Sequence, residues 1–579
     1  MYIGSILNFL YKGFLLFNRY FSGYLILFLL FCLIFFRKNT LSKKHNIISE
    51  KTQLPESFSG IDLKKESKQG WVILLCFLIA LTIALTFSLC PINGQSAGID
   101  SSVFLYIGKR MQSGAVPYRD LFDHKGPLLF FIQYFGLLFS GDKFFGVWII
   151  ELICLTVAIY FSYKTLQVLN SKNTVINFLA ILLSYLVIGL QLFEGGNLTE
   201  EYALPAIAFF GYVFSKFLKT GECTRWETFG AGLGFMAVCL IRINMIGFWM
   251  MGLPIIAGVL VYKKQFKKML YYVFWFVLGA LVIFLPCLIY LLLTNSLVDM
   301  WKYYFVFNFD YAKNYGDGGI GSINQLKSIL FFMKLVWPAT LAIIIYTLAW
   351  LKRGFNKLFK GCVAGVEKDE LICLTCLVIF GFALSLATMS AKNFLHYIMV
   401  LIPFFTIFLQ YLLIQINRYS GKIFRWRIPD DTELDYSIRG LNFIFGFFLA
   451  VTANFYILPH ILVEVTPDLA TEYLQKNTKK DDNVLIAGNA CYGYLNSGRK
   501  YSGKFFYQTP PINASKIALL DFWKDFERNK PKVILIPYDK YNDTTKISDY
   551  LDKKTANGDY SKEILGSSET PLKVYRKNN

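Results

Sequence analysis

Charged residues are scarce in this sequence. Asp, Glu, Lys and Arg make up 17% of the 579 residues, whereas a soluble protein carries about 25%. Apolar residues make up 55% and aromatic residues 18%, so the chain is too hydrophobic to be disordered. The cysteines lie mostly inside apolar runs, which excludes the disulfide framework of a small secreted domain. The composition therefore indicates a chain whose solvent is largely lipid.

The sequence also lacks a metal-binding motif and an internal repeat. Cys373 and Cys376 form a CLTC run inside an apolar segment, but no second pair of Cys or His residues accompanies them. Helix packing therefore explains this pair better than a zinc site does. Transporters built from inverted repeats show internal similarity, and none is visible here.

Apolar runs long enough to cross a membrane recur along most of the chain. A transmembrane helix needs about 20 apolar residues, and twelve segments qualify, which predicts an α-helical polytopic membrane protein. The first segment is too long for a signal peptide and lacks a clear cleavage site, so it predicts an anchor helix. The segments are residues 14–36, 71–90, 144–168, 174–193, 202–219, 227–241, 245–262, 270–294, 329–351, 370–389, 395–416 and 440–459.

The basic residues predict how these segments thread the membrane. The net charge of +20 could indicate a nucleic-acid partner. However, Lys and Arg gather in residues 37–70, 263–268, 352–368 and 418–427, which fall on one side when twelve spans are threaded. Such loops mark the cytoplasmic side. We therefore expect a multi-pass protein of the cell membrane that binds no nucleic acid.

The composition changes abruptly after residue 460, where Lys, Asp and Asn become frequent. Two β-like runs, Val484–Ala487 and Val533–Ile536, flank a stretch with helical periodicity, Ala514–Asn529. This order predicts a small α/β domain, and the threading places it on the extracytoplasmic side. The predicted parts are an anchor helix with a basic loop (1–70), a transmembrane domain with the external loop 91–143 (71–460), and the α/β domain (461–579).

The external stretch from Gly94 to Ile132 is too polar and too aromatic for a linker. We infer that something is bound there. Its charged and titratable residues are Asp100, Lys109, Arg110, Arg119, Asp120, Asp123, His124 and Lys125.

The same stretch predicts two helices lying in the membrane interface. Residues 101–113 can form an amphipathic helix. Residues 126–139 are apolar but short for a span, and they begin at Gly-Pro, which favours a helix start. The face of the first helix that we expect toward lipid consists of Val103, Phe104, Ile107 and Met111.

This pattern resembles the GT-C membrane glycosyltransferases, with glycosyltransferase family 39 and the aminoarabinose and protein-mannosyl transferases nearest in pattern. The shared features are an acidic residue past an early span, then two interfacial helices with a Lys close to a Pro between them. The resemblance continues through GGNLTEEYALP (195–205), LIRINMIGF (240–248) and KNFLHYIMVLIP (392–403), and covers most of residues 71–579.

The resemblance implies a GT-C-like fold and a lipid-linked substrate. The reaction would move a sugar from a polyprenyl-phosphate carrier to an acceptor hydroxyl, with inversion at the anomeric carbon. The acceptor would be a glycan, lipid or protein of the cell envelope, reached from the extracytoplasmic face.

The resemblance also assigns roles in the first external stretch. Asp100 would be the catalytic base, although an Asp before a helical run is also a favoured N-cap. Lys125 would bind the donor phosphate, although here Gly126 separates it from Pro127, and an interfacial Lys can simply reach toward water. Arg119 is a second phosphate candidate, with an ion pair to a neighbouring Asp as the alternative.

Further candidates lie at the mouths of later spans. Arg242 is flanked by apolar sequence on both sides. It would bind the donor phosphate, or it would pair with a buried acid or with backbone carbonyls. Glu200 or Glu201 could bind acceptor, sugar or a divalent cation such as Mg²⁺ or Mn²⁺, or both could cap a helix. His396 and Tyr397 resemble a His-Tyr element near the active cavity of bacterial relatives, with a structural hydrogen bond as the alternative.

Two other functions fit a polytopic chain. A transporter or flippase would also hold buried charges, but the candidates here cluster on one face. An envelope polysaccharide polymerase or ligase would be chemically close, and would ordinarily carry its critical residues in a large late loop rather than in the first.

Overall fold

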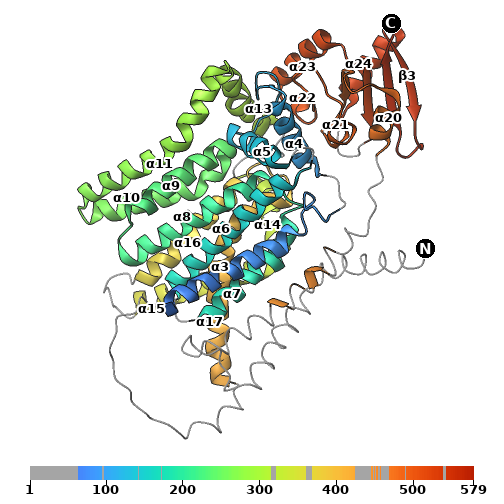
Figure 1. The fold of residues 1–579 in the computed structure, drawn as a ribbon. Coiled ribbons are helices and arrows are strands. Elements are labelled where there is room, and N and C mark those ends of the chain that lie inside the picture. Colours follow the sequence, from blue (N-terminus) through green and yellow to red (C-terminus); the bar gives the residue numbers. More distant parts are fainter. Residues whose placement is uncertain are drawn as a thin grey trace, which may run out of the picture.

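The computed structural model describes residues 63–93, 97–140, 143–170, 173–314, 321–359, 368–423, 468–489, 491–538 and 543–578, with a few residues between 445 and 457. The predicted span 14–36 and most of 440–459 lie outside these residues. Figure 1 shows a bundle of helices with a small sheet at one end, beside α4, α5 and α13.

The helices follow the apolar runs of the sequence. The first group is α3 (Leu63–Ala84), α4 (Ile99–Gln112), α5 (Pro127–Ser140), α6 (Phe145–Leu169), α7 (Thr174–Ile181), α8 (Thr199–Thr220), α9 (Arg225–Ile241), α10 (Gly247–Tyr262) and α11 (Phe266–Leu293). The second group is α12 (Leu297–Met300), η5 (Trp301–Val306), α13 (Phe307–Asn314), α14 (Ile323–Leu335), α15 (Trp337–Phe359), α16 (Lys368–Ala387), η6 (Leu395–Leu401) and α17 (Ile402–Ile423).

The protein is a multi-pass membrane protein. Within the described residues, five helices are long and apolar enough to span a membrane, or six if the pair α14 and α15, bent by 102°, counts as one span. Several other apolar helices, such as α5, are shorter. The exact number of twelve therefore stays a prediction.

Glycines let α9 and α11 approach each other closely. A Cβ atom on Gly232 would lie 1.8 Å from the Phe276 carbonyl oxygen, and one on Gly279 would lie 2.0 Å from the Phe229 carbonyl oxygen. Small residues at helix contacts are typical of membrane proteins, where close backbone packing replaces the hydrophobic effect. On its other side α9 packs against α8, which in turn packs against α6.

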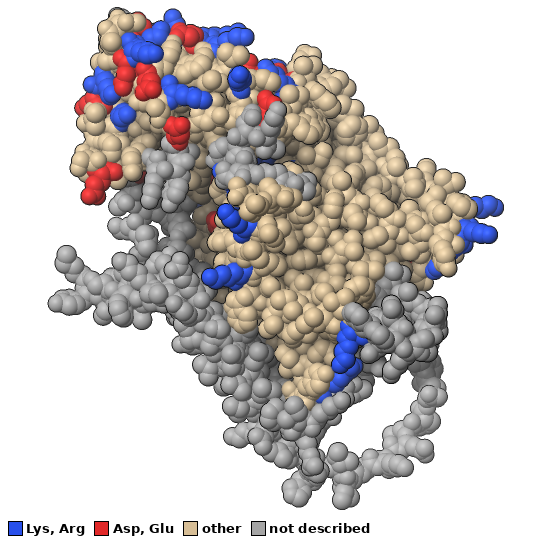
Figure 2. All heavy atoms as spheres, turned by 180° about the vertical axis from the view of Figure 1, so that it is seen from behind, with Lys and Arg blue, Asp and Glu red and all other residues tan. Residues whose placement is uncertain are grey.

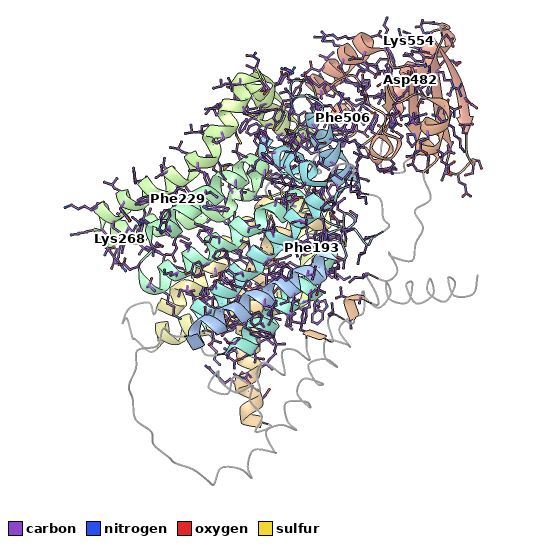
Figure 3. The ribbon with its side chains drawn as sticks, viewed as in Figure 1. Phe193, Phe229, Lys268, Asp482, Phe506 and Lys554 are labelled. Carbon is purple, nitrogen blue, oxygen red and sulfur yellow. The ribbon has the colours of Figure 1, made fainter. Side chains whose placement is uncertain are left out.

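The helix predicted at 101–113 is confirmed as α4, but its predicted lipid-facing side is wrong. Val103, Phe104 and Ile107 are buried, because α5 and the C-terminal domain cover them. The ring of Tyr106 lies 4.7 Å from that of Phe506, which is labelled in Figure 3 where the bundle meets the C-terminal domain.

The C-terminal domain has the predicted β-α-β order. Strand β1 (Val484–Ile486) pairs in parallel with β2 (Val533–Pro537), and α23 (Lys516–Asn529) is the longest helix of the connection between them. The sheet order is β1-β2-β4-β3, with β3 (Tyr560–Leu565) and β4 (Leu572–Lys577) antiparallel. The remaining helices are α20 (Leu469–Asn477), α21 (Tyr492–Ser497), α22 (Pro511–Ala514) and α24 (Thr545–Ala556).

On the face that Figure 2 shows, charged side chains crowd the C-terminal domain, while the bundle is nearly bare of charge. A few basic side chains mark the bundle's far end, including Lys268 on the side of the bundle away from the sheet (Figure 3). This split agrees with one part that lies in lipid and another in water. The predicted boundary at 460 falls outside the described residues.

Polar contacts fix the C-terminal domain to the bundle. Lys302 pairs with Asp521, and Lys504 pairs with Asp299 at 3.2 Å. The Phe122 amide donates to the Lys504 carbonyl at 2.9 Å. The domain therefore covers the loop between α4 and α5.

Candidate active site

Five segments bring the predicted site residues to the end of the bundle that faces the C-terminal domain. Asp100, Glu200 and His396 are the second residues of α4, α8 and η6. Lys125 precedes α5, and Arg242 follows α9. The charges of Asp100 and Glu200 act on Lys125, Arg242 and His396. The structure therefore places two acids and three basic side chains in one cluster.

Asp100 does not cap α4. The N-cap is Gly98, without a side-chain cap hydrogen bond, and Asp100 is the second helical residue. Its side chain is exposed. A carboxylate in this place is stabilised by the positive end of the helix dipole and remains open to a substrate.

Arg242 and Glu200 form a direct ion pair. The helix α9 ends at Ile241, and the extended backbone of Arg242, with φ −161° and ψ 111°, turns its side chain out of the helix. Its Nη1 donates to Glu200 Oε1, and its guanidinium carbon lies 4.9 Å from the centre of the Tyr397 ring. Thr199 Oγ1 donates to the other oxygen of Glu200 at 2.7 Å. The predicted buried partner of the arginine is therefore Glu200.

Hydrogen bonds hold Lys125 in the loop before α5. Its amide donates to Asp123 Oδ1 at 2.7 Å, and its carbonyl accepts from the Tyr118 hydroxyl at 2.6 Å. Its Nζ lies 2.8 Å from His124 Nε2. These bonds fix the backbone on which the ammonium group is carried.

Burial shifts the pKa values of the titratable side chains in this loop. It raises the pKa of the Asp123 carboxyl. Burial, together with the nearby positive charge of Arg242, lowers the pKa of Lys125. Burial, Lys125 and Arg242 hold the pKa of His124 well below 6.5. The two cations therefore oppose each other's charge, and His124 is neutral at pH 7.

Gly126 explains the departure from a direct Lys-Pro pair. A Cβ atom there would lie 2.1 Å from the Leu240 carbonyl oxygen, and the Gly126 amide donates to the Ile241 carbonyl at 2.9 Å. Only a glycine lets this loop approach the end of α9 so closely. The inserted residue thus brings Lys125 beside Arg242.

Arg119 has different partners. It pairs with Asp120 at 2.7 Å, and both side chains are more than a third exposed. Its Nη1 also donates to the Thr294 carbonyl at 3.1 Å. The structure therefore shows the ion pair that was the alternative for Arg119.

His396 and Tyr397 lie beside the cluster. His396 Nδ1 bonds to Glu194 Oε2, and the His396 and Tyr397 rings meet edge to face at 4.9 Å. Glu194 has a φ of +45°. Its one sequence signal is its place in a glycine turn before α8, and sequence reasoning missed it.

Glu201 lies on the other side of α8 from Glu200. It is completely buried, and its Oε2 accepts from the Asn197 amide at 3.1 Å. That amide also donates to Glu151 Oε1. In the described structure, Glu151 Oε2 and Glu201 Oε1 have no hydrogen-bond partner. Two buried carboxyls this close cannot both be charged, so a proton must lie on one of them.

A small pocket opens beside Glu200 and Tyr397. Asn244 also lines it, and the Asn244 Oδ1 atom is buried without a hydrogen-bond partner among the described residues. Sequence reasoning missed Asn244, although it stands two residues after Arg242. The other lining residues are Met245, Gly247, Phe248, Ala383, Ala387 and Val400.

No metal centre forms in the part of the chain that the structure describes. No three His, Cys, Asp or Glu side chains come together there in a group that could hold a metal ion. Glu200 is held by Arg242 instead. A divalent cation stays a prediction, and no step below uses one.

The fold is GT-C-like, as the sequence resemblance predicted, and it matches solved structures of ArnT. The crystal structure of ArnT from Cupriavidus metallidurans bound to undecaprenyl phosphate matches with a TM-score of 0.53 at 12% identity, over 87% of this chain and 98% of that one. ArnT in the apo state matches with a TM-score of 0.53 at 10% identity, over 88% and 98%.

The family is shown by a second comparison. The family model "Putative competence-induced protein Ccs4 N-terminal domain" matches residues 61–466, and this chain belongs to that family. A search of curated proteins found no match.

Proposed function

We propose that this protein is a glycosyltransferase that moves a sugar from a polyprenyl-phosphate carrier to a hydroxyl of a cell-envelope glycan, lipid or protein on the extracytoplasmic face. The observation that carries the proposal is the cluster of Asp100, Lys125, Glu200 and Arg242 at one end of the bundle. The likeness in fold to ArnT bound to undecaprenyl phosphate supports the lipid carrier.

Lys125 and Arg242 would bind the donor phosphate. Two neighbouring cations, one of them with a lowered pKa, repel each other until an anion lies between them. A phosphate would relieve that repulsion, and its negative charge grows as it leaves the sugar. Cations fixed in advance around such a leaving group are usually a large part of catalysis.

Asp100 would act as the base. The acceptor oxygen attacks the anomeric carbon, the bond from that carbon to the phosphate oxygen breaks, and the acceptor proton passes to the Asp100 carboxylate. The polyprenyl phosphate leaves with its charge facing Lys125 and Arg242. Attack from the side opposite to the phosphate inverts the anomeric carbon.

Glu200 would position Arg242, because its ion pair fixes where the guanidinium points. Asn244 lines the neighbouring pocket, and its Oδ1 atom has no hydrogen-bond partner among the described residues. This oxygen would accept a hydrogen bond from a sugar hydroxyl. His396, Tyr397 and Glu194 would complete the wall of the site.

The test is transfer by purified protein in detergent, with synthetic undecaprenyl-phosphate hexoses as donors and cell-envelope material as acceptor. We expect Asp100→Asn to lower the rate by about 10² to 10⁴. The matched control is Asp549→Asn, an exposed residue of α24, which should match wild type. Undiminished transfer by Asp100→Asn would refute the base assignment.

A complete absence of donor turnover, with every sugar tried, would refute the proposed function. A transporter would instead move the lipid-linked sugar across a vesicle bilayer without breaking its phosphate bond. Both outcomes are read from one preparation, reconstituted into liposomes.

A further inference from the structure

The C-terminal domain reaches into the loop that carries Lys125. The Tyr507 hydroxyl lies 3.2 Å from Asp123 Oδ2 and 3.4 Å from His124 Nδ1. On the other side of the imidazole ring, His124 Nε2 lies 2.8 Å from Lys125 Nζ. The side chains of Tyr507 and Asp123 are 5% and 2% exposed, so water does not replace these bonds.

One arrangement of protons satisfies the whole chain of contacts. An ammonium group only donates, so His124 Nε2 accepts from Lys125. A neutral ring then carries its proton on Nδ1, which donates to the Tyr507 oxygen. The Tyr507 hydroxyl donates in turn to the Asp123 carboxylate. This assignment needs a neutral His124, and the low pKa of its ring agrees.

Other contacts hold the His124 ring in place. It stacks on Tyr311 with ring centres 5.4 Å apart. Its backbone carbonyl accepts from Asn308 Nδ2 at 2.8 Å. The ring therefore cannot turn away when its bond to Tyr507 is lost. Its Nδ1–H group would then be buried without an acceptor, so the Tyr507 hydroxyl and the Lys125 ammonium together favour the Nδ1–H tautomer.

We infer that Tyr507 is a positioning residue that fixes the tautomer of His124 and thereby aims the Lys125 ammonium at the donor phosphate. The role at the phosphate rests on the proposed function, whereas the tautomer does not. The ammonium has three N–H donors. One points to His124, which leaves the other two for phosphate oxygens. The C-terminal domain thus supplies part of the active site.

Tyr507→Phe is the direct test, because it removes the hydroxyl and keeps the ring, which packs against Phe506 and Phe122. The matched control is Tyr575→Phe. Tyr575 is also buried in the C-terminal domain, and its hydroxyl donates to Asp552 at 2.7 Å. A general loss of stability would affect both variants alike.

The first measurement needs no lipid. The sequence holds four histidines, so ¹⁵N-histidine labelling of the full-length protein gives few signals, and His124→Gln identifies the one from His124. We expect the wild type and Tyr575→Phe to show the Nδ1–H tautomer, and Tyr507→Phe to show the other tautomer or a mixture. A signal unchanged in Tyr507→Phe, or an Nε2–H tautomer in wild type, would overturn the inference.

The second measurement is the KM for undecaprenyl-phosphate hexose. We expect Tyr507→Phe to raise it about fivefold to tenfold, as for one lost hydrogen bond. Tyr507 acts through His124. We therefore expect the double variant, Tyr507→Phe with His124→Gln, to have the same KM for the donor as His124→Gln alone. If the two substitutions raised the KM independently, so that their effects multiplied in the double variant, this expectation would be contradicted.

The two measurements separate the two claims. If the wild type transfers sugar and Tyr507→Phe has the same KM, the inference about Tyr507 is wrong and the proposed function stands. If Tyr507→Phe shows the expected tautomer change but the wild type transfers no sugar, the proposed function is wrong and the contact between the domains stands.

Discussion

Glu200 and Glu201 are neighbours in the sequence and lie in opposite surroundings. Glu200 pairs with Arg242 and lines the pocket. Glu201 turns into the bundle, where its neighbour is a second acid, Glu151. Successive residues of a helix point about 100° apart. The first turn of α8 therefore carries one acid toward the pocket and the other toward the interior of the bundle.

The two acids meet the cost of burial in different ways. A buried carboxylate needs a cation, and Glu200 has one in Arg242. A buried acid without a cation must keep its proton, and the pair of Glu151 and Glu201 shares at least one. The first region is therefore charged and suited to an anionic substrate, whereas the second is a hydrogen-bonded packing contact.

Substituting Glu200 and Glu201 in turn separates the two acids directly. Glu200→Gln removes the charge that holds Arg242, and we expect the transfer rate to fall by about 10² to 10³. Glu201→Gln should change it less than about threefold, because the Gln oxygen can still accept from the Asn197 amide and no cation loses its partner. Rates with undecaprenyl-phosphate hexose test both. Equal losses of transfer rate in the two variants would contradict the different roles of Glu200 and Glu201.

Two glycines give a matched pair of smaller effects. Gly126→Ala would push the loop of Lys125 away from α9, and we expect about tenfold weaker donor binding. Gly196→Ala would place a Cβ atom 2.6 Å from Glu151 Oε1 at a φ of +84°. We expect it to destabilise the fold by about 1–3 kcal/mol and leave the donor affinity of the folded protein unchanged.

The glycine pair is read with two assays, thermal unfolding and donor binding. Gly211→Ala, at a position of α8 with open space around it, is the control for both. If Gly196→Ala weakens donor binding as much as Gly126→Ala does, the two regions are not independent.

The shared proton predicts a modest effect on stability. Glu151→Gln should change the free energy of unfolding by less than about 1 kcal/mol, since the amide can donate to the Glu201 carboxylate. Thermal unfolding at pH 7 measures this. A strong destabilisation would contradict the shared proton.

The smallest expected effect concerns Arg119. Its ion pair with Asp120 is exposed, and exposed pairs contribute little. We expect Arg119→Gln to change donor KM by less than about twofold. A tenfold rise would place Arg119 in the phosphate site after all.

Local patterns predicted much of this fold. Long apolar runs predicted the helices, and the runs at Val484 and Val533 predicted the parallel strands. Strands β3 and β4 were missed, because YSKEIL and LKVYRK carry charges and show little apolar alternation. Contacts between distant segments were also beyond local patterns: Tyr507 and His124 are 383 residues apart, and no spacing rule joins them.

The same limit explains the errors at the site. The apolar face of α4 looked fit for lipid, and the C-terminal domain covers it instead. Glu200 and Glu201 were equal candidates, because the chain alone does not show which faces Arg242. Glu151 was missed as a lone acid in an apolar span, although an isolated charge in such a span needs a partner.

The central claim is that Lys125 and Arg242 form a phosphate site, and the direct measurement is the affinity of the purified protein for undecaprenyl phosphate. We expect Lys125→Gln and Arg242→Gln each to weaken binding at least about tenfold, as for a lost charged hydrogen bond, and Arg119→Gln to bind as wild type does. Equal binding by wild type, Lys125→Gln and Arg242→Gln, with all three folded, would contradict the account.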